Sequence, residues 1–98
     1  MNELPRGQVL KAYIEIDPST QHCERICLFL EGFDWIEFTG MILNDDGFVL
    51  PSPLGCECTV TDISDRHRSL ADYEIAFKSS YTGEGTFYAK HIRQIASI

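Results

Sequence analysis

The sequence predicts a mainly β domain, an antiparallel sandwich or partly open barrel of about seven strands with at most one short helix. Apolar and polar residues alternate with a period of two through most of the chain. No segment keeps the i, i+3, i+4, i+7 spacing of an amphipathic helix for more than about one turn. Clusters of Gly, Pro, Asn, Asp and Ser separate the alternating segments, as turns do between strands.

The first part of the chain predicts three strands. Residues 10–16 alternate, so the apolar side chains of Leu10, Ala12, Ile14 and Ile16 share a face opposite Lys11, Tyr13 and Glu15. A turn signal, Asp17-Pro18-Ser19-Thr20, separates this segment from a second strand over 23–30. After Glu31-Gly32, a third strand is expected over roughly 35–43. Its alternation directs Ile36 and Phe38 into the core and puts Trp35 on the other face with Glu37 and Thr39.

The second part predicts four more strands. Asn44-Asp45-Asp46-Gly47 indicates a hairpin tip that leads into a short strand over 48–50, which Pro51 and Pro53 end because proline lacks the ladder donor. A fifth strand is expected over 56–63, with Cys56, Cys58 and Val60 facing inward. Residues 64–71 are expected to form a loop or one helical turn. The sixth strand begins at Tyr73, and a glycine-hinged turn leads to the seventh over 86–95.

Length and composition bound the organisation. The chain has 98 residues, of which 44% are hydrophobic, enough apolar material for one domain spanning residues 1–98. No apolar run approaches the length of a membrane helix, and the first residues lack the pattern of a signal peptide. The expectation is a soluble, cytoplasmic protein.

The cysteines are expected to be core residues. A chain without a secretory signal is expected to keep its thiols reduced, and free cysteines behave as small buried hydrophobic groups. The four are Cys23, Cys27, Cys56 and Cys58. Their spacings differ from the Cys-x2-Cys knuckles of structural zinc sites, so no metal or other cofactor is expected; a metal-binding structural module stays an alternative.

Charge is concentrated in the middle of the chain. There are 15 acidic residues against 8 basic ones, for a net charge of −7. The window 26–65 contains no Lys or Arg and eight acidic residues. This distribution argues against nucleic acid and anionic membranes as partners and favours a basic protein.

Within that window, aromatic residues interleave with carboxylates. A strand buries one face against a core, so some of these aromatic side chains are expected at the surface among the acids. Such an arrangement is typical of an interface in which charges steer association and an aromatic anchor holds the complex. The alternative is that the acids only keep a β-rich protein soluble. The predicted partner-binding residues are Glu31, Phe33, Asp34, Trp35, Glu37, Asp45 and Asp46.

The sequence shows no recognised catalytic motif. The sequence has no Gly-rich phosphate loop, no His-Glu-x-x-His and no nucleophile elbow, so no enzymatic activity is expected. Arg66-His67-Arg68 is the one local basic cluster and supports an alternative, a small-molecule-binding barrel or minor enzyme that holds an anion there. His91 would share a face with Phe87 and Ala89 if the last strand were regular.

Two stretches resemble a known class of proteins. Residues 27–40 (CLFLEGFDWIEFTG) and the ending from Tyr73-Glu74-Ile75-Ala76-Phe77 to Phe87-Tyr88-Ala89-Lys90-His91-Ile92 resemble small β-rich immunity proteins of bacterial polymorphic toxin systems. The resemblance implies a cytosolic, acidic protein that blocks a cognate toxin by binding it, and it carries over no functional residue. The function expected from the sequence is a non-catalytic inhibitor of a basic partner, such as a toxin nuclease.

Overall fold

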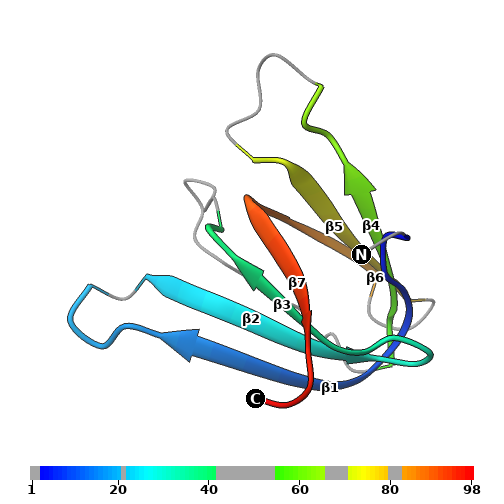
Figure 1. Ribbon diagram of the computed structural model, residues 1–98, viewed down its shortest axis with the longest axis horizontal. Coiled ribbons are helices and arrows are strands. Elements are labelled where there is room, and N and C mark those ends of the chain that lie inside the picture. The colour runs from blue at the N-terminus through cyan, green and yellow to red at the C-terminus, as the bar shows by residue number, and fades with distance from the viewer. Residues whose placement is uncertain (1–2, 21, 42–54, 66–70, 80–82) are drawn as a thin grey trace.

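Seven antiparallel strands form one sheet in the order β6-β5-β4-β1-β2-β3-β7, which does not close into a barrel (Figure 1). The computed structural model describes residues 3–20, 22–41, 55–65, 71–79 and 83–98, and these residues form no helix. The strands are β1 (Arg6–Ile16), β2 (Cys23–Leu30), β3 (Asp34–Thr39), β4 (Glu57–Asp62), β5 (Tyr73–Ser79), β6 (Gly83–Ala89) and β7 (His91–Ile95). The mainly β antiparallel fold predicted from the alternation is therefore confirmed.

The sheet has two halves that share β1. Residues 6–8 of β1 pair with β4, whereas the strand from Val9 onward pairs with β2. Gly7 lies at this crossover with a φ of 144°, and a Cβ built on it would lie 2.7 Å from the carbonyl oxygen of Glu31. Glycine is needed here because both the backbone conformation and the close approach of the β2–β3 turn exclude a side chain.

The two edge strands of the sheet are consecutive in sequence. β6 pairs with β5 at one edge and β7 pairs with β3 at the other. Only Lys90 separates them, and its N–H lies 3.1 Å from the carbonyl oxygens of both Thr39 and Gly40. The chain therefore crosses from one half of the sheet to the other at this residue.

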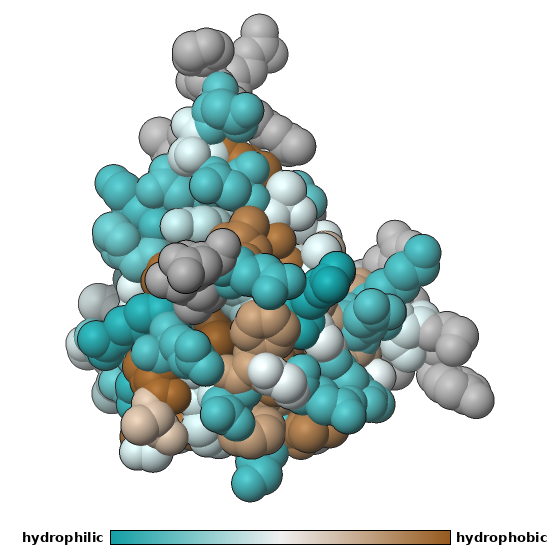
Figure 2. Space-filling model, turned by 45° about the vertical axis from the view of Figure 1, so that its right-hand side comes forward, coloured by the Kyte–Doolittle hydropathy of each residue, from teal (hydrophilic) through white to brown (hydrophobic). Residues whose placement is uncertain are grey.

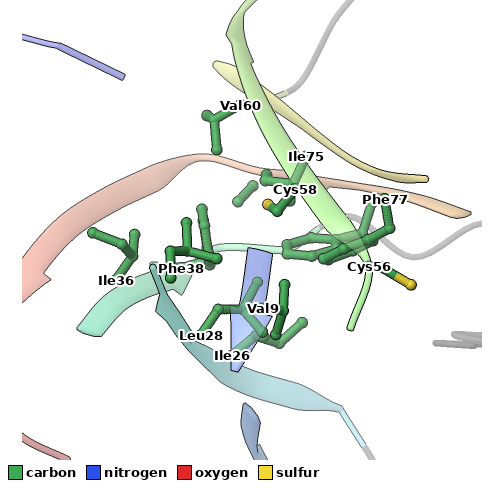
Figure 3. Packing of buried hydrophobic residues seen from close by; sticks show 13 residues of the cluster. Val9, Ile26, Leu28, Ile36, Phe38, Cys56, Cys58, Val60, Ile75 and Phe77 are labelled. Carbon is green, nitrogen blue, oxygen red and sulfur yellow. The ribbon is translucent and has the colours of Figure 1, made fainter. Parts of the chain in front are cut away.

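The core lies between the two halves (Figure 3). Ile26, Leu28, Ile36 and Phe38 come from one half, and Cys58, Ile75 and Phe77 from the other. The predicted inward positions Ile36, Phe38, Cys56, Cys58 and Val60 are all buried, as period-two alternation requires. Phe87 packs between the halves, with its ring 5.4 Å from that of Phe38 and 5.6 Å from that of Phe77.

Several predicted boundaries are corrected. The seventh strand, expected over 86–95, is two strands broken at Lys90, so His91 is exposed on a different strand from the buried Phe87 and Ala89. The third strand ends at Thr39, before Gly40 with its φ of 68°. The first begins at Arg6 rather than at residue 10. The strand expected over 48–50 lies outside the described residues.

Candidate protein-binding face

The side of β1, β2, β3 and β7 that points away from the core holds a group of ion pairs and aromatic contacts among the described residues. We call it the outer face. Register places residues 11, 13 and 15 of β1 and the odd-numbered residues of β2, β3 and β7 on it, because Tyr13 pairs with Cys27, Cys27 with Glu37 and Glu37 with Arg93. Residues on one side of a pleated sheet form contiguous rows across the strands. The outer face is therefore built from four segments of the chain.

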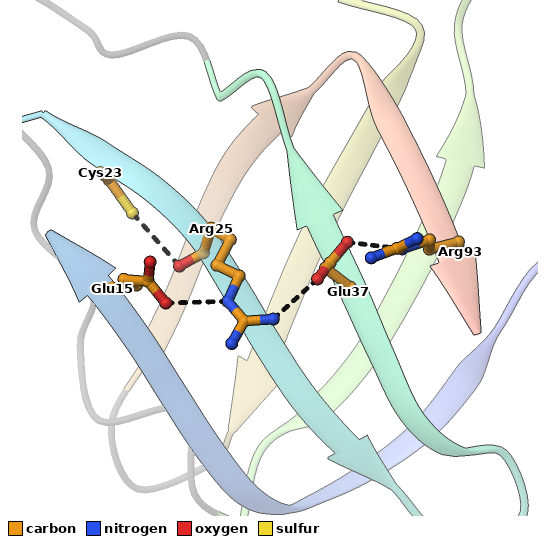
Figure 4. Close-up of polar contacts among 5 residues, drawn as sticks. All are labelled: Glu15, Cys23, Arg25, Glu37 and Arg93. Atoms are coloured by element: carbon orange, nitrogen blue, oxygen red, sulfur yellow. Dashed lines mark hydrogen bonds and ion pairs between the residues drawn. The ribbon is translucent and has the colours of Figure 1, made fainter. Parts of the chain in front are cut away.

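Four charged residues cross this face as a continuous ladder (Figure 4). Arg25 Nε donates to Glu15 Oε2 at 3.0 Å, and Arg25 Nη1 donates to Glu37 Oε2 at 2.9 Å. Arg93 Nε donates to the other carboxylate oxygen of Glu37, at 2.6 Å. The charge ladder of Glu15, Arg25, Glu37 and Arg93 thus joins β1, β2, β3 and β7 and has no net charge.

Glu37 is the central member of the charge ladder. Its side chain is only 7% exposed, although that of Arg93 is 70% exposed. Hydrogen bonds from Arg93 and then from Arg25 hold the pKa of Glu37 below its usual range, and burial opposes this shift less strongly. The same bonds raise the pKa of Arg25 and Arg93. Glu37 is therefore ionised and engaged by two guanidinium groups.

Glu37→Gln is expected to destabilise the fold by about 2 kcal/mol near neutral pH, since it removes two charge-assisted hydrogen bonds whose arginines can still rehydrate. The lowered pKa in the folded state means that this stabilisation is complete above the unfolded pKa of about 4.3 and is lost as pH falls through the folded value. Urea denaturation of both proteins from neutral to acid pH should therefore give curves that converge on acidification. A constant difference at all pH values would contradict the electrostatic account.

An aromatic row lies beside the charge ladder. The rings of Phe29 and Trp35 meet edge to face, with centroids 5.4 Å apart. Lys11 Nζ lies 5.5 Å from the centroid of Phe29, and Arg25 Cζ lies 5.5 Å from that of Tyr13. Phe29 and Trp35 are half-buried and Tyr13 is exposed. Phe29 and Trp35 are paired across β2 and β3 and form what we call the aromatic row, and Tyr13 lies in the neighbouring row with Cys27 and Glu37. The aromatic row thus presents apolar surface between charged groups.

Two carboxylates, Glu31 in the β2–β3 turn and Asp34 at the start of β3, lie next along these strands. Glu31 and Asp34 are exposed, and neither forms an ion pair with any described residue. The turn is fixed on both sides, because Glu31 N–H donates to the Gln8 carbonyl at 3.0 Å and Gln94 Nε2 donates to the Phe33 carbonyl at 2.7 Å. The backbone that carries the two acids is therefore held in place by hydrogen bonds to neighbouring strands.

The structure separates the predicted partner-binding residues into groups. Glu31 and Asp34 are exposed in and beside the β2–β3 turn, and Trp35 follows Asp34 in β3, on the outer face opposite Ile36 and Phe38 as predicted. Phe33 is half-buried and packs against the core cluster. Glu37 lies on the predicted face but is buried in the charge ladder rather than free to steer a partner. Asp45 and Asp46 lie outside the described residues.

The predicted partner-binding set omitted six side chains of the outer face: Lys11, Tyr13, Glu15, Arg25, Phe29 and Arg93. Alternation placed Lys11, Tyr13 and Glu15 on one face of their strand, and Phe29 with Cys23 and Cys27 on one face of the next; Arg25 shares the parity of Cys27. The contact between Glu37 and Arg93 depends on the pairing of β3 with β7. No local sequence signal specifies that pairing.

The cysteines occupy mostly buried positions. All four are reduced thiols; Cys56 and Cys58 belong to the core cluster and Cys27 is buried beneath the outer face, whereas Cys23 is half-buried. Burial raises the pKa of Cys58 to about 12, so its thiol stays protonated and unreactive. In the described part of the chain, no three His, Cys, Asp or Glu side chains are grouped so as to hold a metal ion.

The remaining candidate, Arg66-His67-Arg68, lies outside the described residues. The ranges that are described include no helix long and apolar enough to span a membrane. Comparison of the chain with protein-family models, with curated proteins and with solved structures finds no match. Any inference about function therefore rests on the residues of the outer face and the turn beside it.

Proposed function

We propose that the protein is a non-catalytic inhibitor of the immunity-protein kind, which binds a basic protein partner with the β2–β3 end of its outer face. The observation that carries the proposal is that exposed Glu31 and Asp34 lie in and beside the β2–β3 turn, within four residues of the half-exposed Trp35. Partly exposed aromatic residues next to acids combine the two properties that an interface with a basic protein needs.

The electrostatics of the outer face support a localised binding site. The charge ladder is neutral as a whole, so it contributes little to the attraction of a partner at long range. Glu31 and Asp34 carry two negative charges at the β2–β3 turn, which the single positive charge of Lys11 over Phe29 offsets in part. A basic partner would therefore be attracted to the turn rather than to the middle of the sheet.

The aromatic row supplies the apolar contact in this proposal. Phe29 and Trp35 support each other edge to face, so their exposed surfaces are held in place before binding. A preorganised aromatic surface loses little conformational entropy on association. In this proposal, the acids increase the rate of association and the aromatic rings slow the dissociation of the complex.

The test requires the natural partner, captured from an extract of the source cells on the immobilised protein, identified by mass spectrometry and purified. Glu31→Gln/Asp34→Asn is expected to slow association by about tenfold at low salt and to weaken its salt dependence, because exposed rim charges act through steering. Asp62→Asn/Asp65→Asn is the matched control. It removes the same charge from exposed positions at and just after the last residue of β4, away from the β2–β3 turn. Surface plasmon resonance at several salt concentrations gives both rates.

Trp35→Ala tests the anchor in the same assay. A loss of about 2 kcal/mol in binding, expressed mainly as faster dissociation, is expected for a ring at the centre of the contact. The inhibitory role adds a second readout, because one equivalent of the protein should abolish the activity of the captured partner. Unchanged affinity in both the Trp35 variant and the acid variant, or a bound partner that stays fully active, would refute the proposal.

A further inference from the structure

Most of β1 has no strand on one of its sides within the described residues. β4 pairs with residues 6–8, and two further hydrogen bonds join Val9 to Gly55 and Cys56. From Leu10 to Ile16, β1 pairs with β2 alone among the strands of the structure. In Figure 1 this part of β1 forms the lower border of the hairpin that projects from the body of the molecule. We call residues 10–16 the free edge.

The free edge is apolar for an exposed strand. Leu10, Tyr13, Ile14 and Ile16 are between 37% and 57% exposed and are large hydrophobic residues. Figure 2 shows apolar surface breaking the hydrophilic surface in the lower part of the molecule, at the height of β1 and β2 in Figure 1. Soluble proteins usually protect such edges with prolines, β-bulges, several charges or a covering segment. This edge has no proline and carries one Lys and one Glu. Its register with β2 shifts between Val9 and Lys11 and between Glu15 and Ile16, whereas residues 11–15 pair without a shift.

We propose that the free edge pairs with the free edge of a second copy of this chain, antiparallel and about a two-fold axis at Tyr13. Residues 11–15 pair with β2 without a register shift, and this register gives each of them a counterpart, since Tyr13 is their midpoint. Ala12 then faces Ile14 of the second copy, and Leu10 and Ile16, at the two register shifts, lie at the ends of the paired segment. The exposed apolar side chains are thereby paired with one another across the axis.

The charges of Lys11 and Glu15 favour the same register, independently of how many residues overlap. With Tyr13 on the axis, Lys11 lies directly opposite Glu15 of the second copy, and the symmetry repeats the pair. Both residues lie on the outer face, where antiparallel partners have Cβ atoms about 5 Å apart. Moving the register by two residues toward the start of the strand would place Glu15 opposite Val9, whose backbone is already bonded to Gly55 and Cys56. Only the Tyr13-centred register therefore combines full overlap with two ion pairs of Lys11 with Glu15.

The pairing would extend the outer face and does not depend on the proposed inhibitory function. Glu15 is the end of the charge ladder, so Lys11 of the second copy would continue the alternation of charge across the axis. The β2–β3 turn with Glu31 and Asp34 belongs to the opposite end of β2 and stays accessible in each copy. The experiments below use only the purified protein.

Disulfide cross-linking tests the register. In a Cys27→Ala background, needed because Cys27 lies opposite Tyr13 in β2 and would compete for the new thiol, Tyr13→Cys should form a disulfide-linked dimer on mild oxidation. Residues facing each other on the axis have Cα atoms about 4.5 to 5.5 Å apart, which suits a disulfide. Leu10→Cys in the same background is the matched control, because its two copies would be about 20 Å apart. Non-reducing electrophoresis should show the dimer for the Tyr13 variant only.

Charge reversal tests the ion pairs without new thiols. Sedimentation velocity over a concentration series should show a monomer–dimer equilibrium for the unmodified protein. Lys11→Glu should weaken dimerisation by about tenfold, because two like-charged pairs replace two attractive ones. Lys11→Glu/Glu15→Lys should recover most of the loss, whereas the remote Lys90→Glu should leave the equilibrium unchanged. Circular dichroism of each variant verifies that it is folded.

Three results would overturn the proposal. The first is an unmodified protein that stays monomeric at millimolar concentration. The second is a dimer in which Tyr13→Cys and Leu10→Cys cross-link equally. The third is a dimer that Lys11→Glu does not weaken while the variant stays folded. The last two results would place the contact between copies elsewhere on the molecule.

Discussion

Phe38→Ala is expected to lower the free energy of unfolding by about 4 kcal/mol, because it removes a fully buried ring and leaves a cavity that the surrounding strands cannot fill. The ring of Phe38 meets that of Phe87 edge to face, and Phe87 stacks on Phe77. These three rings come from β3, β6 and β5 and therefore join the two halves of the sheet. Losing one ring should weaken the contact between the halves as well as the local packing.

Trp35→Ala is the matched control for this change, since the two residues are on opposite faces of the same strand. Trp35 is half-buried and packs mainly on Phe29, so its removal should cost about half as much as that of Phe38. Urea denaturation followed by circular dichroism, with similar slopes for both variants, gives the comparison. Equal losses for the two variants would mean that the outer face stabilises the fold as strongly as the core does.

Gly7→Ala is expected to cost about 3 kcal/mol or more, the second large effect. A methyl group at this position would meet the Glu31 carbonyl oxygen at 2.7 Å, and that atom belongs to the backbone of a turn held by hydrogen bonds. The φ of 144° adds strain of about 1 to 3 kcal/mol for any residue with a side chain. Relief would require β1 to move away from the β2–β3 turn at the crossover between the halves of the sheet.

Gly32→Ala separates these two contributions. Gly32 also has a positive φ, 88°, but nothing lies within 4 Å of a Cβ built on it. Its replacement should therefore cost only the conformational strain, about 1 kcal/mol. Thermal denaturation of both variants gives the ranking. Losses of similar size would show that the close approach of the Glu31 carbonyl to Gly7 adds nothing to the cost of Gly7→Ala.

The sequence predicted those features that depend on alternation within one strand. Ile36 and Phe38 on one face of β3, and Cys56, Cys58 and Val60 around β4, are placed as expected because a pleated strand has a fixed period. The break at Lys90 escaped prediction, although the apolar positions change parity there, from Phe87 and Ala89 to Ile92; the pairing of β7 with β3 reveals it.

The candidate site was predicted less completely, because part of it depends on contacts between strands that are far apart in the sequence. Glu31, Asp34 and Trp35 lie within five residues in and beside one turn, so their nearness follows from the sequence itself. Glu37 was expected among the exposed acids, yet guanidinium groups from β2 and β7 cover it. The exposure of Ile14 and Ile16 likewise depends on where β4 stops pairing with β1. Contacts between strands decide these outcomes, and a single sequence does not display them.

The placement of β7 has a consequence for the order in which the chain folds. β1, β2 and β3 form one meander and β4, β5 and β6 another, and each is built from neighbouring strands joined in sequence order. β7 instead returns to β3, and the bond between Arg93 and Glu37 links residues 56 positions apart. Closing so long a loop costs more entropy than closing a hairpin, and such contacts slow folding. Loop-closure entropy therefore places the docking of β7 after the two meanders along the folding path.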